Sequence, residues 1–78
     1  MIVPKDAKTW RIIGNKLAKK GDTKNALSCY EKALEIDPKD AKTWAIKGAI
    51  LEQQGNLDEA STCYEKAKNL GFQFPNNE

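Results

Sequence analysis

One segment of seven residues occurs twice in this chain. Residues 4–10 read Pro-Lys-Asp-Ala-Lys-Thr-Trp, and residues 38–44 repeat them unchanged, 34 positions later. With the same offset, 17 of the 34 positions of the two copies agree. A fixed period between about 20 and 50 residues is typical of repeat proteins, in which one supersecondary unit stacks on the next. The sequence predicts a single domain over residues 1–78, with a first repeat at 4–37, a second at 38–71 and a tail at 72–78.

Within each copy, apolar and small residues recur at steps of three and four, which is the pattern of an amphipathic helix. The first such stripe consists of Trp10, Ile13, Gly14, Leu17 and Ala18. Prolines precede the first helix of each copy, and glycines stand at the turns. The predicted N-caps, which would accept an amide hydrogen, are Asp6, Asp40 and either Asp22 or Thr23. The pattern predicts an all-α fold of two stacked antiparallel helix–turn–helix repeats, with helices over 7–20, 24–36, 41–54 and 58–70.

Two glycines occupy helical positions one period apart. Gly14 and Gly48 each cost a helix roughly 1 kcal/mol relative to alanine, so we expect close helix–helix approach to offset that cost. The aromatic residues Trp10, Trp44, Tyr30 and Tyr64 are predicted to lie in the core.

The second copy ends differently from the first. Gly71 and Phe72 stand where the first copy has Asp37 and Pro38. This predicts a glycine-terminated helix end with Phe72 folded back on the last turn. With no further helix to cover the fourth one, we expect Leu57 and Leu70 to stay partly open.

Charge is distributed unevenly along the chain, whose net charge is +2. Residues 1–25 carry seven Lys and Arg against two Asp, whereas residues 26–78 carry six Lys against nine Asp and Glu. This asymmetry favours either an acidic partner or head-to-tail self-association, and it is equally typical of a solvated helix face. No apolar run approaches the roughly 18 residues of a membrane span, so no membrane partner is expected.

The two cysteines occupy equivalent sites, Cys29 and Cys63, one repeat apart. Packed helices stand about 8–10 Å apart, and a disulfide needs Cα atoms within about 7 Å. We therefore expect two thiols, which suits the cytoplasm. The chain has no histidine, no nucleophile–base pair and no phosphate-binding glycine loop, so the sequence predicts no metal site, no cofactor and no enzyme.

The repeated positions resemble the tetratricopeptide repeat, whose period is 34 residues and whose pattern is W-x2-L-G-x2-Y, then A-x3-F, then P. The first copy supplies Trp10, Ile13, Gly14, Leu17, Ala26, Tyr30, Ala33 and Pro38, and the second supplies Trp44, Gly48, Leu51, Ala60, Tyr64 and Ala67. There are two departures. Lys47 replaces an apolar residue, so its amine is expected to reach solvent. Phe72 replaces the closing proline, which suggests that the array ends there.

The resemblance implies a right-handed superhelix, or α-solenoid, whose concave groove is lined by helices 7–20 and 41–54 and binds a peptide segment of another protein. Members of the family act mostly as adaptors and scaffolds. The groove positions of the family fall here on Lys8, Arg11, Ile12, Asn15 and Lys19 in the first copy, and on Lys42, Ala45, Ile46, Ala49 and Gln53 in the second.

Some family members hold the C-terminal carboxylate of heat-shock chaperones with a basic residue and an asparagine one turn apart. Arg11 and Asn15 match that pair in type, but Ile46 stands where a second asparagine would be. The leading hypothesis is therefore a protein-interaction module for an acidic or C-terminal peptide. Two alternatives remain: a structural unit of a longer array that stacks or self-associates, and, least favoured, nucleic-acid binding through the basic first helix.

Overall fold

The computed structural model describes residues 5–74, and these form four helices and no strand. The helices are α1 (Ala7–Lys19), α2 (Thr23–Ile36), α3 (Ala41–Gln53) and α4 (Leu57–Asn69). Each end lies within one residue of its predicted position, so the predicted all-α fold is confirmed. Residues 1–4 and 75–78 lie outside the described residues, and with them the predicted start of the first repeat at Pro4 and most of the predicted tail.

Two of the three predicted N-caps are confirmed, and of Asp22 and Thr23 it is Asp22 that caps α2. Asp6 and Asp22 each accept the backbone N–H of the residue three positions further on, at 2.7 and 3.3 Å. Asp40 also stands at the N-cap position of α3, but it accepts no amide hydrogen there. Its Oδ2 instead accepts the hydroxyl of Thr43 at 2.6 Å. The prediction for Asp40 was therefore wrong in its partner, because the carboxylate accepts the hydroxyl of Thr43 and not its amide hydrogen.

The helix end predicted at Gly71 is confirmed. Gly71 has a φ of +103°, and the N–H of Phe72 donates to the carbonyl of Ala67 at 2.9 Å. This is the Schellman hydrogen bond, and the left-handed glycine that it requires is strained for other residues. The backbone of Phe72 is therefore fixed against the last turn of α4.

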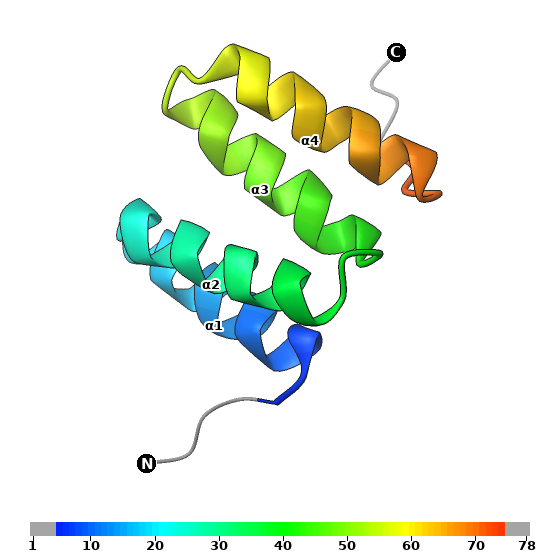
Figure 1. Cartoon of the computed structure of the whole chain (residues 1–78). Coiled ribbons are helices and arrows are strands. Elements are labelled where there is room, and N and C mark those ends of the chain that lie inside the picture. The colour runs from blue at the N-terminus through cyan, green and yellow to red at the C-terminus, as the bar shows by residue number, and fades with distance from the viewer. Residues whose placement is uncertain (1–4, 75–78) are drawn as a thin grey trace.

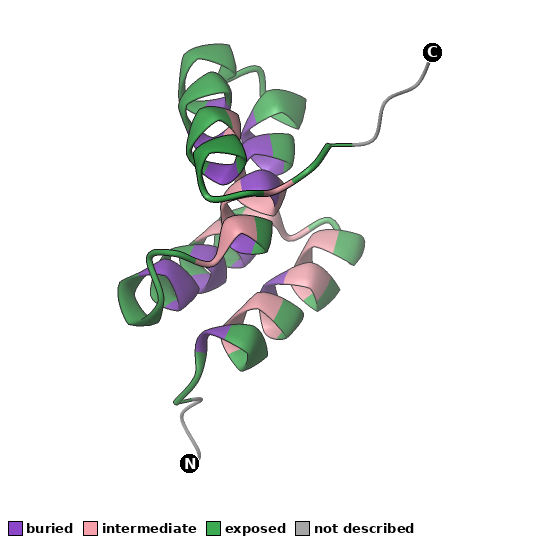
Figure 2. Cartoon of the chain, turned by 90° about the vertical axis from the view of Figure 1, so that its right-hand side faces the viewer, coloured by how far each residue is buried: buried purple, intermediate pink, exposed green. Residues whose placement is uncertain are grey.

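The helices form two antiparallel pairs, α1 with α2 and α3 with α4, and α2 packs on α3 to join them (Figure 1). Buried residues gather on the facing sides of the helices, while the outer sides are exposed (Figure 2). One buried cluster, between the repeats, consists of Ala26, Tyr30 and Ile50, with Leu17, Ala18, Leu27 and Ile46 packed against it. A second, inside the second repeat, consists of Leu51, Ala60 and Cys63, with Leu27, Trp44 and Tyr64 packed against it.

The close approach predicted at the helical glycines is confirmed. A Cβ atom on Gly14 would lie 2.7 Å from Cε1 of Tyr30, and one on Gly48 would lie 2.8 Å from Cε1 of Tyr64. Carbon atoms in contact normally stand about 3.5–4.0 Å apart. Each repeat therefore uses a glycine on its first helix to seat the tyrosine of its second.

The aromatic residues are less uniformly buried than predicted. Tyr30 is fully buried as expected, but Tyr64, Trp10 and Trp44 are only half-buried. The indole N–H of Trp44 donates to the carbonyl of Pro38 at 2.8 Å. Trp44 is thus less buried than predicted, because its polar N–H donates to a carbonyl at the edge of the cluster.

The amines of Lys47 and Lys66 lie 5.6 and 5.3 Å from the centre of the Trp44 ring. Lys47, which stands at an apolar position of the repeat, thus extends its amine across the ring surface. The prediction that Leu57 and Leu70 remain open is confirmed, since both are exposed. Within residues 5–74, the helices are too short and too polar to cross a bilayer.

Candidate functional site

The predicted groove residues lie on α1 and α3. Their exposure differs: Lys8, Ile12, Lys19, Lys42, Ala49 and Gln53 are exposed, Arg11, Asn15 and Ile46 are half-buried, and Ala45 is buried. The cluster between the repeats holds Leu17 and Ala18 of α1 together with Ile46 and Ile50 of α3. Residues of both helices therefore pack in one apolar cluster, together with Ala26, Leu27 and Tyr30 of α2.

Arg11 is the residue that connects α1 directly to the start of α3. Its Nε lies 3.7 Å from Oδ2 of Asp40, and each side chain is 17% exposed. The Nε is buried without a hydrogen-bond partner, so the contact with Asp40 is an ion pair and not a hydrogen bond at that atom. Sequence reasoning placed Arg11 in the groove but did not find Asp40, because an N-cap residue is expected to face its own helix.

Asn15 is engaged inside the first repeat. Its Oδ1 accepts the hydroxyl of Tyr30 at 2.7 Å. The equivalent position in the second repeat is Ala49, which cannot accept a hydrogen bond, and the hydroxyl of Tyr64 donates instead to Oε1 of Glu52 at 2.7 Å. The amide NH2 of Asn15 is therefore the part of this side chain that can donate to a bound peptide.

The two tyrosines titrate above their ordinary range. Burial raises the pKa of Tyr30. Burial first, and then the hydrogen bond donated to Glu52, raise the pKa of Tyr64 to about 12. Each hydroxyl is thus held protonated by its surroundings.

These shifts predict how stability depends on pH. A tyrosine in the unfolded chain ionises near pH 10, so stability from the raised pKa is fully present below about pH 10. It is lost as pH rises from there through about 12, because the unfolded state then releases protons that the native state keeps. We expect the free energy of unfolding by urea to fall over this interval. Tyrosinate absorbance with an ordinary midpoint near pH 10 in the folded protein would contradict the assignment.

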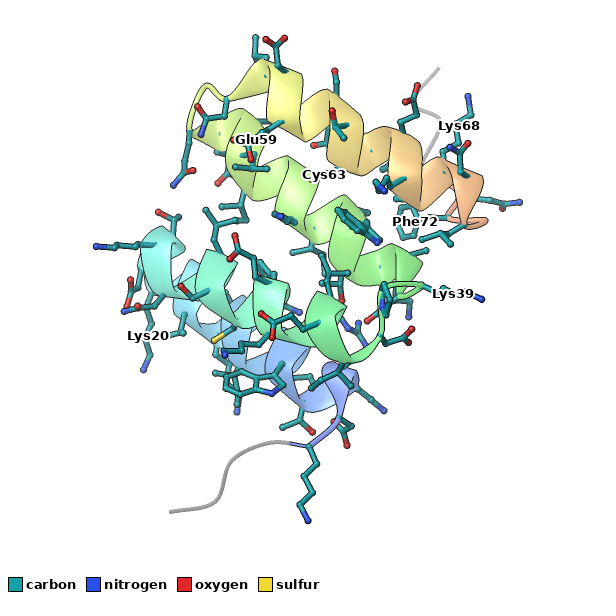
Figure 3. The ribbon with its side chains drawn as sticks, viewed as in Figure 1. Lys20, Lys39, Glu59, Cys63, Lys68 and Phe72 are labelled. Carbon is teal, nitrogen blue, oxygen red and sulfur yellow. The ribbon has the colours of Figure 1, made fainter. Side chains whose placement is uncertain are left out.

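Phe72 and Phe74 lie against predicted groove residues of α3. Ala45, Ile46, Ala49 and Tyr64 line a cavity of about 260 Å³ together with Phe72 and Phe74. Figure 3 shows Phe72 beside α3 near the C-terminal end of α4, with Lys68 on α4 close by. Sequence reasoning missed Tyr64, Phe72 and Phe74 as groove neighbours. The signal was present, since Phe72 interrupts the repeat pattern at its closing proline.

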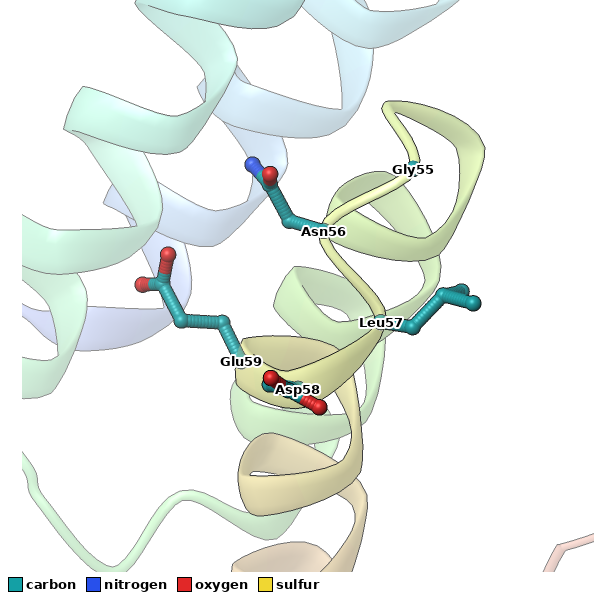
Figure 4. A pocket seen from close by; sticks show the side chains of 5 residues that line it. All are labelled: Gly55, Asn56, Leu57, Asp58 and Glu59. Carbon is teal, nitrogen blue, oxygen red and sulfur yellow. The ribbon is translucent and has the colours of Figure 1, made fainter.

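A separate cavity of about 310 Å³ lies at the turn between α3 and α4, lined by residues 55–59 (Figure 4). Asn56 and Glu59 point to one side of it and Leu57 points to the other. Asp58 and Glu59 occupy the first turn of α4, where their negative charge complements the helix dipole. The same charge repels an anionic ligand from the helix end. This cavity is therefore best explained by the shape of the α3–α4 turn.

Within the described part of the chain, the potential metal ligands are not grouped and the two thiols are buried. Within residues 5–74, no group of three or more Cys, Asp and Glu is placed to hold a metal ion. Cys29 and Cys63 are both buried and form no disulfide with each other. Burial raises the pKa of each thiol, which disfavours the reactive thiolate.

Comparison with known protein families gives two overlapping matches. A sequence model of the tetratricopeptide repeat matches residues 7–40, and a second model with the same description matches residues 29–60. Together they span α1, α2, α3 and the start of α4. A search of curated proteins found no match.

Proposed function

The chain belongs to the tetratricopeptide repeat family, whose repeats are protein–protein interaction modules, and from this premise we propose that it binds an extended acidic peptide along α1 and α3. The observation that carries the proposal is the set of exposed lysines on these two helices. Lys8, Lys19 and Lys42 are exposed, and the same helices carry the half-buried Ile46 and the 41% exposed Ile12. Cations around an apolar base suit a peptide with carboxylates and an aliphatic anchor.

Arg11 and Asn15 fit this function in a modified form. Arg11 is held by Asp40, so a peptide carboxylate must share the guanidinium with it. A guanidinium has five N–H donors and can serve two carboxylates at once. Asn15 keeps its amide NH2 for a peptide carbonyl while its oxygen accepts from Tyr30. The pair is thus positioned by the fold before a peptide arrives, which lowers the ordering cost of binding.

The binding prediction concerns three single substitutions measured with one probe, a fluorescein-labelled peptide rich in Asp and Glu. We expect Arg11→Ala to weaken binding by about 1–3 kcal/mol, the scale of a lost hydrogen bond to a charged group. Asp40→Asn should tighten binding, because it releases Arg11 and removes a negative charge, and the asparagine oxygen can still accept the hydroxyl of Thr43. Lys32→Ala, at an exposed position of α2, should leave the affinity unchanged.

Fluorescence anisotropy at low and at high salt measures these affinities. Exposed charge pairs are screened by salt, so the affinity should fall as ionic strength rises. If Arg11→Ala binds as tightly as the parent chain, or if Lys32→Ala weakens binding equally, the groove assignment is wrong.

The side chains at the open face of the second repeat give less support to the stacking alternative. The first repeat packs Leu27 of α2 against the second repeat and buries Leu34 on the same helix. The equivalent residues of α4 are Ser61 and Lys68. Both are exposed. A polar outer face is the property of a terminal repeat rather than of one that accepts a neighbour. Mass measured at several concentrations separates these functions, since a stacking unit should associate.

Nucleic-acid binding, the least favoured alternative, would use accessible aromatic rings for base stacking, and both tryptophans are half-buried. A second feature opposes base stacking on Trp44. The amines of Lys47 and Lys66 already lie over its ring. RNA binding that depends steeply on salt, together with no binding of the acidic peptide, would favour this alternative.

A further inference from the structure

Phe72 and Phe74 cover part of the proposed groove. The rings of Phe74 and Tyr64 lie 5.3 Å apart at an interplanar angle of 88°, and those of Phe72 and Phe74 lie 4.7 Å apart at 68°. Both are edge-to-face arrangements, the favoured geometry for aromatic pairs. Phe72 and Phe74 also line the cavity of about 260 Å³ that includes Ile46 and Ala49 of the groove. An aromatic side chain therefore already occupies the apolar surface beside Ile46 and Ala49.

The first repeat shows what this position requires. Tyr30 is fully buried because Ile46 and Ile50 of the following repeat pack around it. Tyr64 is its equivalent in the second repeat, and no third repeat covers it within the described residues. Phe74 contacts it instead. The ring of Tyr64 is thus an apolar surface that Phe74 covers in place of a following helix.

The attachment of Phe74 is weaker than that of Phe72. The N–H of Phe72 donates to the carbonyl of Ala67, which ties it to α4. Among residues 5–74, no backbone hydrogen bond joins Gln73 or Phe74 to the helices, and Phe74 is 39% exposed. Phe74 can therefore leave Tyr64 without unwinding α4, by rotation of the backbone beyond Phe72.

We propose that the surface formed by Ala45, Ile46, Ala49 and Tyr64, here called the aromatic seat, binds a phenylalanine side chain of the partner peptide, and that Phe74 occupies the seat until the partner displaces it. The inference rests on the proposed function, because Ile46 and Ala49 belong to both the groove and the seat. It adds a specificity to the proposed binding: the acidic partner peptide carries a phenylalanine.

The chemistry of the seat explains why the occupant is aromatic. Phe74 demonstrates that a phenyl ring fits edge-to-face on Tyr64, next to Glu52 and Lys68, which line an adjoining cavity of about 390 Å³. The small side chains of Ala45 and Ala49 leave room for a ring that a larger residue would fill. A partner's phenylalanine makes the same contacts, so exchange replaces one ring with another. An intramolecular competitor lowers the apparent affinity by the fraction of time that the seat is empty.

The test uses two labelled peptides of the same acidic sequence, one with a single phenylalanine and one with alanine in its place. Anisotropy gives the affinity of each for the parent chain and for Phe74→Ala. We expect Phe74→Ala to bind the phenylalanine peptide about three- to tenfold more tightly than the parent, the scale of one edge-to-face ring pair. Its affinity for the alanine peptide should be unchanged. Leu57→Ala, at an exposed position at the start of α4, is the matched control and should change neither affinity.

A second variant and a spectrum keep the result interpretable if Phe74→Ala alters the fold. Ala49→Leu should fill the seat and remove the preference for phenylalanine over alanine. In the parent chain, nuclear Overhauser contacts between the Phe74 ring and Tyr64 should disappear when the phenylalanine peptide is added.

Three other outcomes are distinguishable. Both peptides binding with equal affinity to parent and Phe74→Ala would overturn the aromatic seat and leave the groove intact. Weaker binding of the phenylalanine peptide to Phe74→Ala would show that Phe74 is a fixed part of the surface, which also overturns the seat. If neither peptide binds any variant, the proposed function fails, and the seat fails with it.

Discussion

Leucine in place of Gly14 should lower the free energy of unfolding by about 1–3 kcal/mol or more, through overpacking. The first added atom alone would lie 2.7 Å from Cε1 of Tyr30 and 3.2 Å from the carbonyl oxygen of Ala26. The tyrosine cannot move away freely, because it is fully buried and its hydroxyl is bonded to Asn15. Leucine is a better helix former than glycine by several tenths of a kcal/mol, so the clash must exceed that gain.

Urea unfolding followed by circular dichroism measures this change. Lys16→Leu, at an exposed position of α1, is the control for adding a leucine to this helix, and its stability should stay close to that of the parent. Gly48→Leu should behave like Gly14→Leu, since its Cβ would lie 2.8 Å from Tyr64. A Gly14→Leu chain that unfolds at the parent's urea concentration or above would show that the helices are not in close contact there.

The largest expected loss of stability follows Tyr30→Ala. Removing a buried aromatic side chain typically costs about 3–5 kcal/mol, from lost burial and from the cavity left behind. Tyr30 belongs to the cluster that joins the two repeats, so its removal loosens their contact as well as the first repeat. Small domains are stable by only about 5–15 kcal/mol, and this variant should therefore be largely unfolded in modest concentrations of urea.

Tyr64→Ala is the matched variant one repeat later. Tyr64 is only half-buried and is covered by Phe74 instead of by a following helix. Its loss should cost clearly less, on the order of 1–2 kcal/mol. Equal losses from the two variants would contradict the view that the second repeat buries Tyr30 and that nothing comparable buries Tyr64.

The sequence predicted the helices and their pairing well because the two copies report the same pattern independently. Gly14 and Gly48 would each be an anomaly alone, but together they indicate a contact, and each lies against a tyrosine. Helix ends were accurate within one residue because glycine turns and aspartate caps are local signals. Local chemistry of this kind is readable without knowledge of the tertiary structure.

Contacts between elements were predicted less well. The pairing of Arg11 with Asp40 joins residues 29 positions apart, and the repeat pattern gives no sign of it, because the equivalent of Arg11 is Ala45. The partial exposure of Trp44 depends on a carbonyl at Pro38 and two lysines from different helices. The position of Phe74 on Tyr64 depends on how the chain leaves α4. Each is a property of tertiary packing that local sequence patterns do not report.

The most direct test of the proposed function is to map the bound peptide by NMR. Backbone amide shifts of the isotope-labelled chain would be followed while the acidic peptide is added at low salt. The proposed groove predicts the largest shifts on α1 and α3, at and around Lys8, Ile12, Lys42 and Ile46, with little change at Lys32 on α2. Shifts concentrated on α2 and α4, or none at saturating peptide, would contradict the proposed groove.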